Sequence, residues 1–279
     1  MQQLYRDISY ETSKLITRSY STSFSKAVSY LEPGIREAVY SIYGFVRIAD
    51  EIVDSFQDYD REKLISQFER DYYEAYENRI SINPALNSFQ ETVRNYNIPD
   101  ELIKAFLNSM KADLHKSFYT SKTETDEYVY GSAEVVGLMC LMVFVKGDPV
   151  QYNELKEPAR RLGAAFQKVN FLRDIKNDTE QLDRHYFHNT IGKEFTENVK
   201  KEIVDDILED FRSAYPGIKK LPQDSRIGVL IAYYYFLTLL RKINNTPAVR
   251  QFERRIRIPD FIKLLILSKA LVVTKLGLI

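Results

Sequence analysis

The sequence predicts an all-α protein that forms a single domain over residues 1–279. Apolar residues recur at helical spacing through most of the chain, and no series of alternating strands is present. Prolines and Pro-Gly pairs fall between the periodic stretches, where they end helices. No break in composition divides the chain, and a hydrophobic fraction of 44% is ample for one core.

The predicted helices follow one another with short breaks. Residues 4–30 begin as a helix and then reach YSTSFSKAVSY, whose hydroxyls favour helix capping over the alternative of anion binding. Further helices are expected over Tyr40–Asp54, Arg61–Asn78, Ala85–Tyr96, Glu101–Phe118, Tyr128–Val145, Glu154–Asp178, Val199–Tyr215, Ile227–Ile243 and a final apolar stretch from Phe261. Asp113 is interpreted as a surface acid.

The helix over 40–54 carries two aspartates on a surface that is otherwise apolar. At about 100° per residue, four side chains share an arc of about 60°: Tyr43, Arg47, Asp50 and Asp54. Apolar residues cover the other directions, so most of this helix should be buried. One arginine cannot neutralise two buried carboxylates, and another positive group is therefore expected to meet them.

The stretch QKVNFLRDIKNDTEQLDRHYF over 167–187 has the same character. Four polar side chains share an arc of roughly 80°: Gln167, Asn170, Asp174 and Asp178. Val169, Phe171 and Ile175 point elsewhere and give the helix a surface to bury. Acids four residues apart also arise by chance on solvated faces, but two such motifs in one chain favour a function.

Two such helices facing each other would form a four-carboxylate site for hard divalent cations. Mg²⁺ suits this site because it takes oxygen ligands, keeps several waters and bridges to substrate phosphates. Magnesium with arginines nearby is chemistry for a diphosphate leaving group. The 20 tyrosines and 16 phenylalanines suit an apolar cavity that stabilises a carbocation.

Composition and the chain ends limit the remaining classes. Lys plus Arg equals Asp plus Glu, at 39 each, so net charge does not favour a nucleic-acid partner. The single cysteine, Cys140, is expected to be a buried thiol in a reducing cytosol. The first residues lack a continuous apolar run, so no signal peptide is expected. Lysines interrupt the apolar stretch from Phe261, so we expect a helix packed on the core, with contact to a membrane surface as the second interpretation.

These residues together resemble the squalene and phytoene synthases, which are head-to-head prenyl synthases, and look most like bacterial phytoene synthases. The resemblance runs from Tyr20 to about Leu271. The family's first aspartate-rich motif matches residues 43–54, and its second matches 167–178, followed by RHYF from Arg184. The family's serine-rich SxSF start matches residues 21–24, and a stretch that begins with tyrosine matches YGSAEVVG over 130–137.

The resemblance implies an isoprenoid-synthase helical bundle around a central cavity, with a role for each matched residue. The implied metal ligands are Asp50, Asp54, Asp174 and Asp178. The implied catalytic residues are Tyr43, Arg47, Tyr130, Arg173 and Tyr186. The implied substrate-binding residues are Ser21, Ser23, Phe24, Gln167, Asn170 and Arg184. The cofactor is expected to be Mg²⁺, with Mn²⁺ as the alternative and no organic cofactor.

The implied activity is a Mg²⁺-dependent prenyltransferase of the phytoene synthase type. Two geranylgeranyl diphosphates would condense to a cyclopropylcarbinyl diphosphate, which rearranges to phytoene in carotenoid biosynthesis. The alternative joins two farnesyl diphosphates to dehydrosqualene, or to squalene if NADPH reduces the intermediate. A different class keeps the fold as a non-catalytic assembly factor, and the intact aspartates speak against it.

The chain also departs from the family pattern. Glu51 replaces a common aspartate, and His188 follows Phe187 where the family has proline. Glu134 replaces a glycine at the expected cavity wall, where it would narrow the tunnel or pair with a cation of the site. Val28 and Tyr40 are expected to border the cavity and to influence chain length. One of the three tyrosines over 233–235 is expected to match a family tyrosine.

The partners and location follow from this chemistry. The partners are expected to be prenyl diphosphate substrates, without nucleic acid, and the protein is expected to be a monomer. A long hydrocarbon product cannot leave into water, so we expect a cytoplasmic protein in peripheral contact with the inner face of the cytoplasmic membrane.

Overall fold

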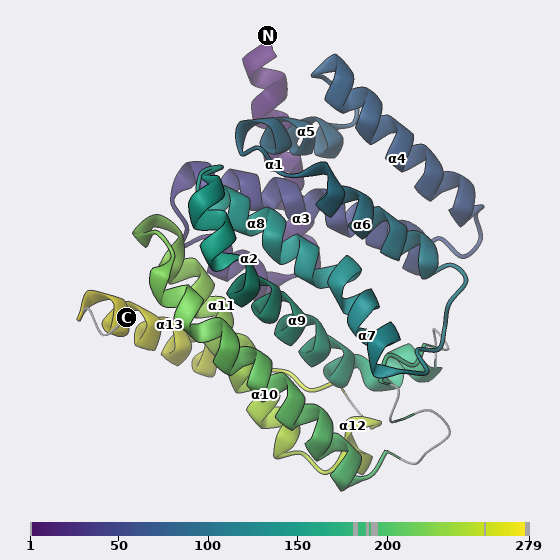
Figure 1. The fold of residues 1–279 in the computed structure, drawn as a ribbon, viewed down its shortest axis with the longest axis vertical. Helices are drawn as coiled ribbons and strands as arrows, with labels where there is room; N and C mark the ends of the chain where they lie inside the picture. The colour runs from purple at the N-terminus through teal and green to yellow at the C-terminus, as the bar shows by residue number, and fades with distance from the viewer. Residues whose placement is uncertain (1, 181–183, 188–189, 191–194, 254, 277–279) are drawn as a thin grey trace.

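The computed structural model describes residues 2–180, 184–187, 190, 195–253 and 255–276, and these contain helices and no strand. The predicted all-α class is therefore confirmed (Figure 1). The elements in chain order are α1 (Gln2–Tyr20), α2 (Thr22–Val28), α3 (Pro33–Asp54), α4 (Arg61–Asn78), α5 (Pro84–Asn95), α6 (Asp100–Ala112), α7 (Lys122–Val129), the π-helical turn η1 (Tyr130–Glu134), α8 (Val135–Phe144), α9 (Pro149–Glu180), α10 (Glu197–Lys220), α11 (Gln223–Asn244), α12 (Ala248–Gln251) and α13 (Asp260–Lys275).

The helices from the two ends of the chain lie on opposite sides of α9. Helices α1 and α3 to α6 occupy the upper part of Figure 1, and α10, α11 and α13 occupy the lower part. Helix α9 packs against η1 and α8 on one side and against α10 and α11 on the other. Helix α3 packs against α1, α5 and α8. Of the two predicted aspartate helices, α3 thus lies in one half of the bundle and α9 lies between the halves.

An aromatic cluster fixes α3 from the side away from α9. The Phe45 ring stacks on Phe89 with centroids 3.9 Å apart, and it also contacts Phe68, Tyr72 and Phe106. All five rings are buried. Aromatic pairs bury large apolar areas and prefer defined geometries, so this cluster sets the rotation of α3 about its axis.

Prolines lie inside both of the long helices that pack most extensively on each other. We expected a helix to end at Tyr215 before Pro216-Gly217, but α10 continues through them to Lys220. Gly217 approaches α9 so closely that an added Cβ would lie 2.3 Å from Pro158 Cβ. The small residue at this crossing therefore lets α9 and α10 come together.

The predicted helix over 128–145 consists of α7, η1 and α8. The helix over Lys122–Phe144 is long and apolar enough to cross a membrane, but 56% of its most apolar window is buried inside the fold. This segment is therefore a core helix of the bundle.

Candidate active site

A cavity of about 1340 Å³ lies inside the bundle and follows α9 from Leu155 to Asp178. This length of helix spans about 35 Å at 1.5 Å per residue. Carboxylates and guanidiniums line the part next to the C-terminal ends of α3 and α9. Apolar side chains line the remainder, among them Val28, Leu31, Val136, Leu141, Phe144, Leu162 and Phe166. Exposed residues such as Arg255 and Asp260 also line it, so the charged end reaches the surface.

The first predicted motif faces this cavity. Tyr43, Arg47, Asp50 and Asp54 all belong to the lining. The Arg47 guanidinium forms ion pairs with both Asp50 and Glu51. The substitution at Glu51 therefore leaves the line of the two aspartates intact and gives Arg47 a second carboxylate.

The second motif lines the opposite wall. Gln167, Asn170, Arg173, Asp174 and Asp178 all face the cavity from α9. The Asp174 carboxylate accepts hydrogen bonds from Arg173 Nε at 3.0 Å and from Arg173 Nη2 at 2.5 Å. The predicted alignment of four polar side chains along one face is thus present in the structure.

Arg184 contacts both motifs, and its backbone N–H donates to the Asp178 carbonyl of the second at 2.7 Å. Its Nη1 donates to Asp54 Oδ1 at 2.6 Å and lies 3.4 Å from the Tyr186 hydroxyl. Its Nη2 donates to the Asp113 carbonyl at 3.4 Å. Arg184 is therefore the positive group, expected from the sequence, that meets the aspartates of α3.

The carboxylates crowd one another across the cavity. Burial and the neighbouring Asp54 raise the pKa of Asp50 to about 7, although Arg47 and Arg184 oppose the shift. Burial and Asp174 raise the pKa of Asp178 to about 7, with a further contribution from Asp54 on the opposite wall. The protein's own arginines thus do not fully compensate the negative charge of the carboxylates at this end of the cavity at neutral pH.

This donor set fits hard divalent cations bound jointly by protein and substrate. Among the described residues, no group of three or more His, Cys, Asp and Glu side chains forms a closed metal site. Instead, Asp50 and Asp54 face Asp174 and Asp178 as two separate pairs. Mg²⁺ is usually held by one or two carboxylates plus waters and substrate phosphates, and these pairs supply that arrangement.

The hydroxyl-rich stretch borders the same end of the cavity. Ser21, Ser23 and Phe24 belong to the lining. We expected capping to be the main role of this stretch, but Ser21, the N-cap residue of α2, makes no side-chain cap hydrogen bond. Its hydroxyl instead hydrogen-bonds Tyr43, whose ring stacks on Phe24 with centroids 5.1 Å apart.

Two positions singled out in the sequence do not face the cavity. Tyr130 is absent from the lining and instead lies under the Arg160 guanidinium, 5.4 Å from the ring centroid. The expectation that Glu134 narrows the tunnel is wrong, because Glu134 is also outside the lining and accepts a hydrogen bond from Arg160 Nε at 2.7 Å. Arg160 is also outside the lining, so the alternative expectation that Glu134 pairs with a cation of the site is wrong as well.

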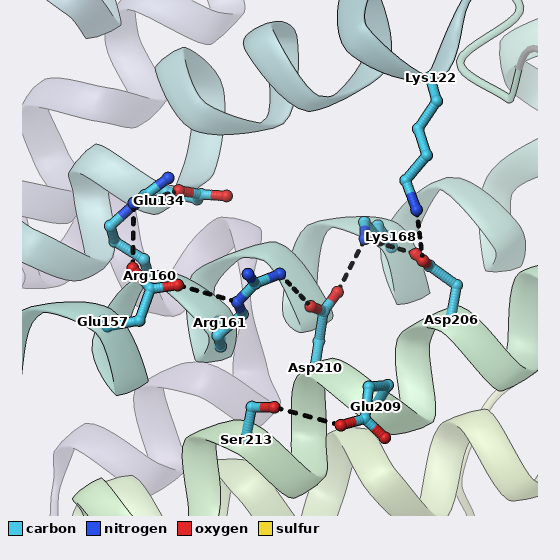
Figure 2. A network of polar contacts seen from close by, with 10 residues as sticks. All are labelled: Lys122, Glu134, Glu157, Arg160, Arg161, Lys168, Asp206, Glu209, Asp210 and Ser213. Atoms are coloured by element: carbon cyan, nitrogen blue, oxygen red, sulfur yellow. Dashed lines mark hydrogen bonds and ion pairs between the residues drawn. The ribbon is translucent and has the colours of Figure 1, made fainter.

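A polar network on the side of α9 away from the cavity fixes the rotation of α9 about its own axis (Figure 2). Lys168 Nζ donates to Asp206 at 2.6 Å and to Asp210 at 2.8 Å, both on α10. Arg161 Nη1 donates to Asp210 at 3.2 Å. Lys168 lies about 120° around α9 from Asp174. Fixing one face of the helix against α10 therefore directs the polar face into the cavity.

Comparison with known proteins identifies the family. The family model described as squalene/phytoene synthase matches residues 17–261. The chain belongs to the squalene/phytoene synthase family. It is accordingly an enzyme of that family, a head-to-head prenyltransferase.

Individual relatives are distant. A 4,4'-diapophytoene synthase of Staphylococcus haemolyticus is 28% identical over 72% of this chain and 70% of its own length. A 15-cis-phytoene synthase of Synechocystis is 26% identical over 94% of this chain and 84% of its own. A dehydrosqualene synthase crystal structure shares the fold with a TM-score of 0.84 at 21% identity, covering 98% of both chains. A squalene synthase from Alicyclobacillus acidocaldarius has a TM-score of 0.72 at 20% identity, over 91% of this chain and 97% of its own.

Asp113 and Tyr128 are lining residues that sequence reasoning missed in this squalene/phytoene synthase. The interpretation of Asp113 as a surface acid is wrong, since the residue is only 8% exposed. Its carboxylate accepts hydrogen bonds from the Tyr128 hydroxyl at 2.7 Å and the Tyr119 hydroxyl at 3.4 Å. Helix phase could have found Tyr128, because it precedes the lining residues Ser132 and Val136 by four and eight positions.

The remaining expectations concern other parts of the lining. Of the three tyrosines over 233–235, Tyr235 lines the cavity. Val28 also lines it, whereas the expectation for Tyr40 is wrong: this side chain is buried outside the lining and donates to the Ser25 carbonyl at 3.3 Å. Cys140 is a free thiol in the cavity wall and is half-buried where a fully buried thiol was expected; desolvation raises its pKa to about 12. His188 lies outside the described residues.

Arg255 is a further charged residue of the site. It precedes α13, and its guanidinium donates to both Asp174 oxygens, at 2.7 and 3.0 Å. No periodicity marks this position in the sequence, because the segment before α13 is not helical.

Proposed function

We propose that this enzyme is a Mg²⁺-dependent phytoene synthase of carotenoid biosynthesis, which condenses two geranylgeranyl diphosphates head to head. The proposal rests on one observation: two pairs of aspartates face each other at one end of a long apolar cavity along α9. The charged end suits diphosphate groups with their metal ions, and the apolar length suits prenyl tails. The breadth of the match to the phytoene synthase of Synechocystis, 94% of this chain, supports the same substrate class.

The charged residues bind and orient the diphosphates. Arg47, Arg173 and Arg184 point into the aspartate end of the cavity, where guanidiniums hold phosphate oxygens through paired hydrogen bonds. Ser21 and Ser23 offer hydroxyls from the neighbouring wall. The four aspartates would hold Mg²⁺, which would supply positive charge to stabilise the departing diphosphate.

The remaining wall stabilises the carbon skeleton. Cleavage of one allylic C–O bond releases diphosphate and leaves a carbocation, which the double bond of the second substrate attacks. The new carbocation loses a proton as the cyclopropane ring closes, which gives a cyclopropylcarbinyl diphosphate. Tyr43 and Tyr186 border the aspartates and present aromatic faces that stabilise positive charge. Tyr186 is stacked on Phe171 with centroids 3.9 Å apart, so its ring is held in place. The apolar wall excludes water, which would otherwise quench the cation.

A farnesyl-using reaction is the second candidate. The relative from Staphylococcus haemolyticus, named a diapophytoene synthase, is 28% identical, and this favours a shorter substrate pair. In that case the product is dehydrosqualene, or squalene if NADPH supplies a hydride.

Product analysis tests the proposal. Purified protein is incubated with Mg²⁺ and labelled geranylgeranyl or farnesyl diphosphate, with and without NADPH, and the hydrocarbon chain length is measured. A C40 product supports the phytoene reaction, and a C30 product alone replaces it with the farnesyl reaction. Absence of both product and diphosphate release would refute an enzymatic role and favour the assembly-factor class.

The same proposal includes the oligomeric state and the cellular location of the enzyme. We expect a cytoplasmic monomer without an organic cofactor, in which Mn²⁺ replaces Mg²⁺ with partial activity. Light scattering of the pure protein and metal titration of diphosphate release test these two expectations.

A further inference from the structure

We infer that the outer face of α13 is a docking surface for an anionic lipid bilayer, placed at the opening of the cavity. The inference rests on the proposed function for the nature of the product and on the described residues for the surface itself. Helix α13 is apolar on two opposite sides. Its inner side packs on α11, with Ile266 and Ala270 buried.

The outer side of α13 has no apolar partner among the described residues. Large side chains with high exposure follow one another along it: Phe261 (66%), Leu264 (64%), Leu265 (61%), Val272 (53%) and Leu276 (66%). At about 100° per residue they fall within an arc of about 120°, in which the exposed polar residues are Ser268 and, in the last turn, Lys275. A stripe of this width is what an interfacial helix inserts below the lipid headgroups.

The charges of α13 favour an anionic membrane over a second copy of the chain. The helix carries three lysines against one aspartate, a net charge of +2. The Lys269 ammonium is held beside the stripe, 4.3 Å from the Tyr234 ring centroid. Lysines beside an apolar stripe are attracted to anionic headgroups, whereas a two-fold dimer through this face would bring like charges together.

The position of α13 connects this surface with the cavity. Pro259, Asp260 and Lys263, at the start of the helix, belong to the cavity lining. A hydrocarbon formed inside has no charged group to carry it into water. A bilayer seated on α13 would receive it directly from the opening.

The other exposed apolar stripe does not have these properties. Leu4, Ile8 and Leu15 lie along one side of α1 and are 64%, 48% and 64% exposed. The exposed acid Glu11 lies in the same line, and none of the four residues lines the cavity. Helix α1 therefore provides a control in which the two leucines, Leu4 and Leu15, are at least as exposed as Leu264 and Val272.

Vesicle flotation of the full chain tests the inference. The vesicles are phosphatidylcholine alone or phosphatidylcholine mixed with phosphatidylglycerol. We expect the protein to float with the mixed vesicles. Added salt should lower its affinity for these vesicles about fivefold for each lysine whose charge is screened. The pair Leu264→Glu and Val272→Glu should lower vesicle affinity by more than about tenfold, because each places a charge where an apolar side chain enters the bilayer. The control pair Leu4→Glu and Leu15→Glu should float like the unchanged protein.

Three results would overturn the inference: no flotation of the unchanged protein, equal flotation of the α13 pair, or a dimer that light scattering shows to dissociate in the α13 pair. The last result would assign the face to self-association. Turnover of prenyl diphosphate in detergent separates this inference from the proposed function. Turnover in detergent without flotation would refute the docking surface alone. Flotation without turnover would refute the proposed phytoene synthase activity, and with it the argument that the hydrocarbon product leaves into a bilayer.

Discussion

Asp113→Asn should stabilise the metal-free protein in a pH-dependent way. Burial raises the pKa of Asp113 to about 7 from an ordinary value near 3.8. Because the folded state binds this proton more tightly than the unfolded state, folding loses stability as pH rises from about 4 to about 7. A difference of about three pKa units corresponds to about 4 kcal/mol.

Asparagine removes this charge but disturbs the hydrogen bond from Tyr128, which costs about 1 kcal/mol. The net gain in the free energy of unfolding should therefore be about 3 kcal/mol at pH 8, and below about 1 kcal/mol at pH 5. Urea unfolding without divalent metal at both pH values measures it. Exposed Asp58→Asn serves as the control and should change neither value. A gain of equal size at both pH values, or a loss at pH 8, would refute the role assigned to burial.

Three further predictions concern α9 and α10. Lys168→Met should lower the free energy of unfolding by about 3–5 kcal/mol, because it removes the buried cation of Asp210 and leaves that buried carboxylate only the longer contact with Arg161, whereas exposed Lys122→Met should cost less than about 1 kcal/mol. Gly217→Ala should cost about 1–3 kcal/mol through overlap with Pro158 Cβ, and the cost should be smaller when it is measured in a Pro158→Gly background, which lacks that Cβ. Asp174→Asn should reduce diphosphate release by about 100-fold or more while the protein remains folded by circular dichroism.

These predictions fail in distinct ways. Equal losses in the two lysine variants would mean that the network in Figure 2 does not hold α9. A tolerated Gly217→Ala would mean that the helix crossing can widen. Full activity of Asp174→Asn would remove this carboxylate from the chemistry.

Helical periodicity predicted the fold class and the alignment of the two motifs. The angular rule holds for Asp50 and Asp54 on α3 and for Asp174 and Asp178 on α9, because both helices are continuous there. Neither segment alone shows that its aspartates face those of the other segment across the cavity. This arrangement depends on how α3 and α9 pack against other helices, which the family resemblance supplied.

The residues that sequence reasoning misplaced lie where regular helix ends or changes. Asp113 follows the end of α6, so the polar neighbours that suggested a surface position do not share its direction. Tyr130 begins the π-helical turn, and the lining is instead reached by Tyr128, one turn before Ser132. Arg255 lies outside any helix, and its contact with Asp174 joins positions 81 residues apart.

The arginines that hold the aspartates have a consequence for the order of binding events. Arg255 occupies both oxygens of Asp174, Arg184 occupies one oxygen of Asp54, and Arg47 is paired with Asp50. A divalent cation that enters here must first displace internal counter-ions, and a diphosphate gives those released guanidiniums a new partner. Binding of metal and diphosphate is therefore an exchange of ion partners. Metal bound without diphosphate would leave the released arginines without an anionic partner. Metal and diphosphate should accordingly bind more tightly together than either does alone.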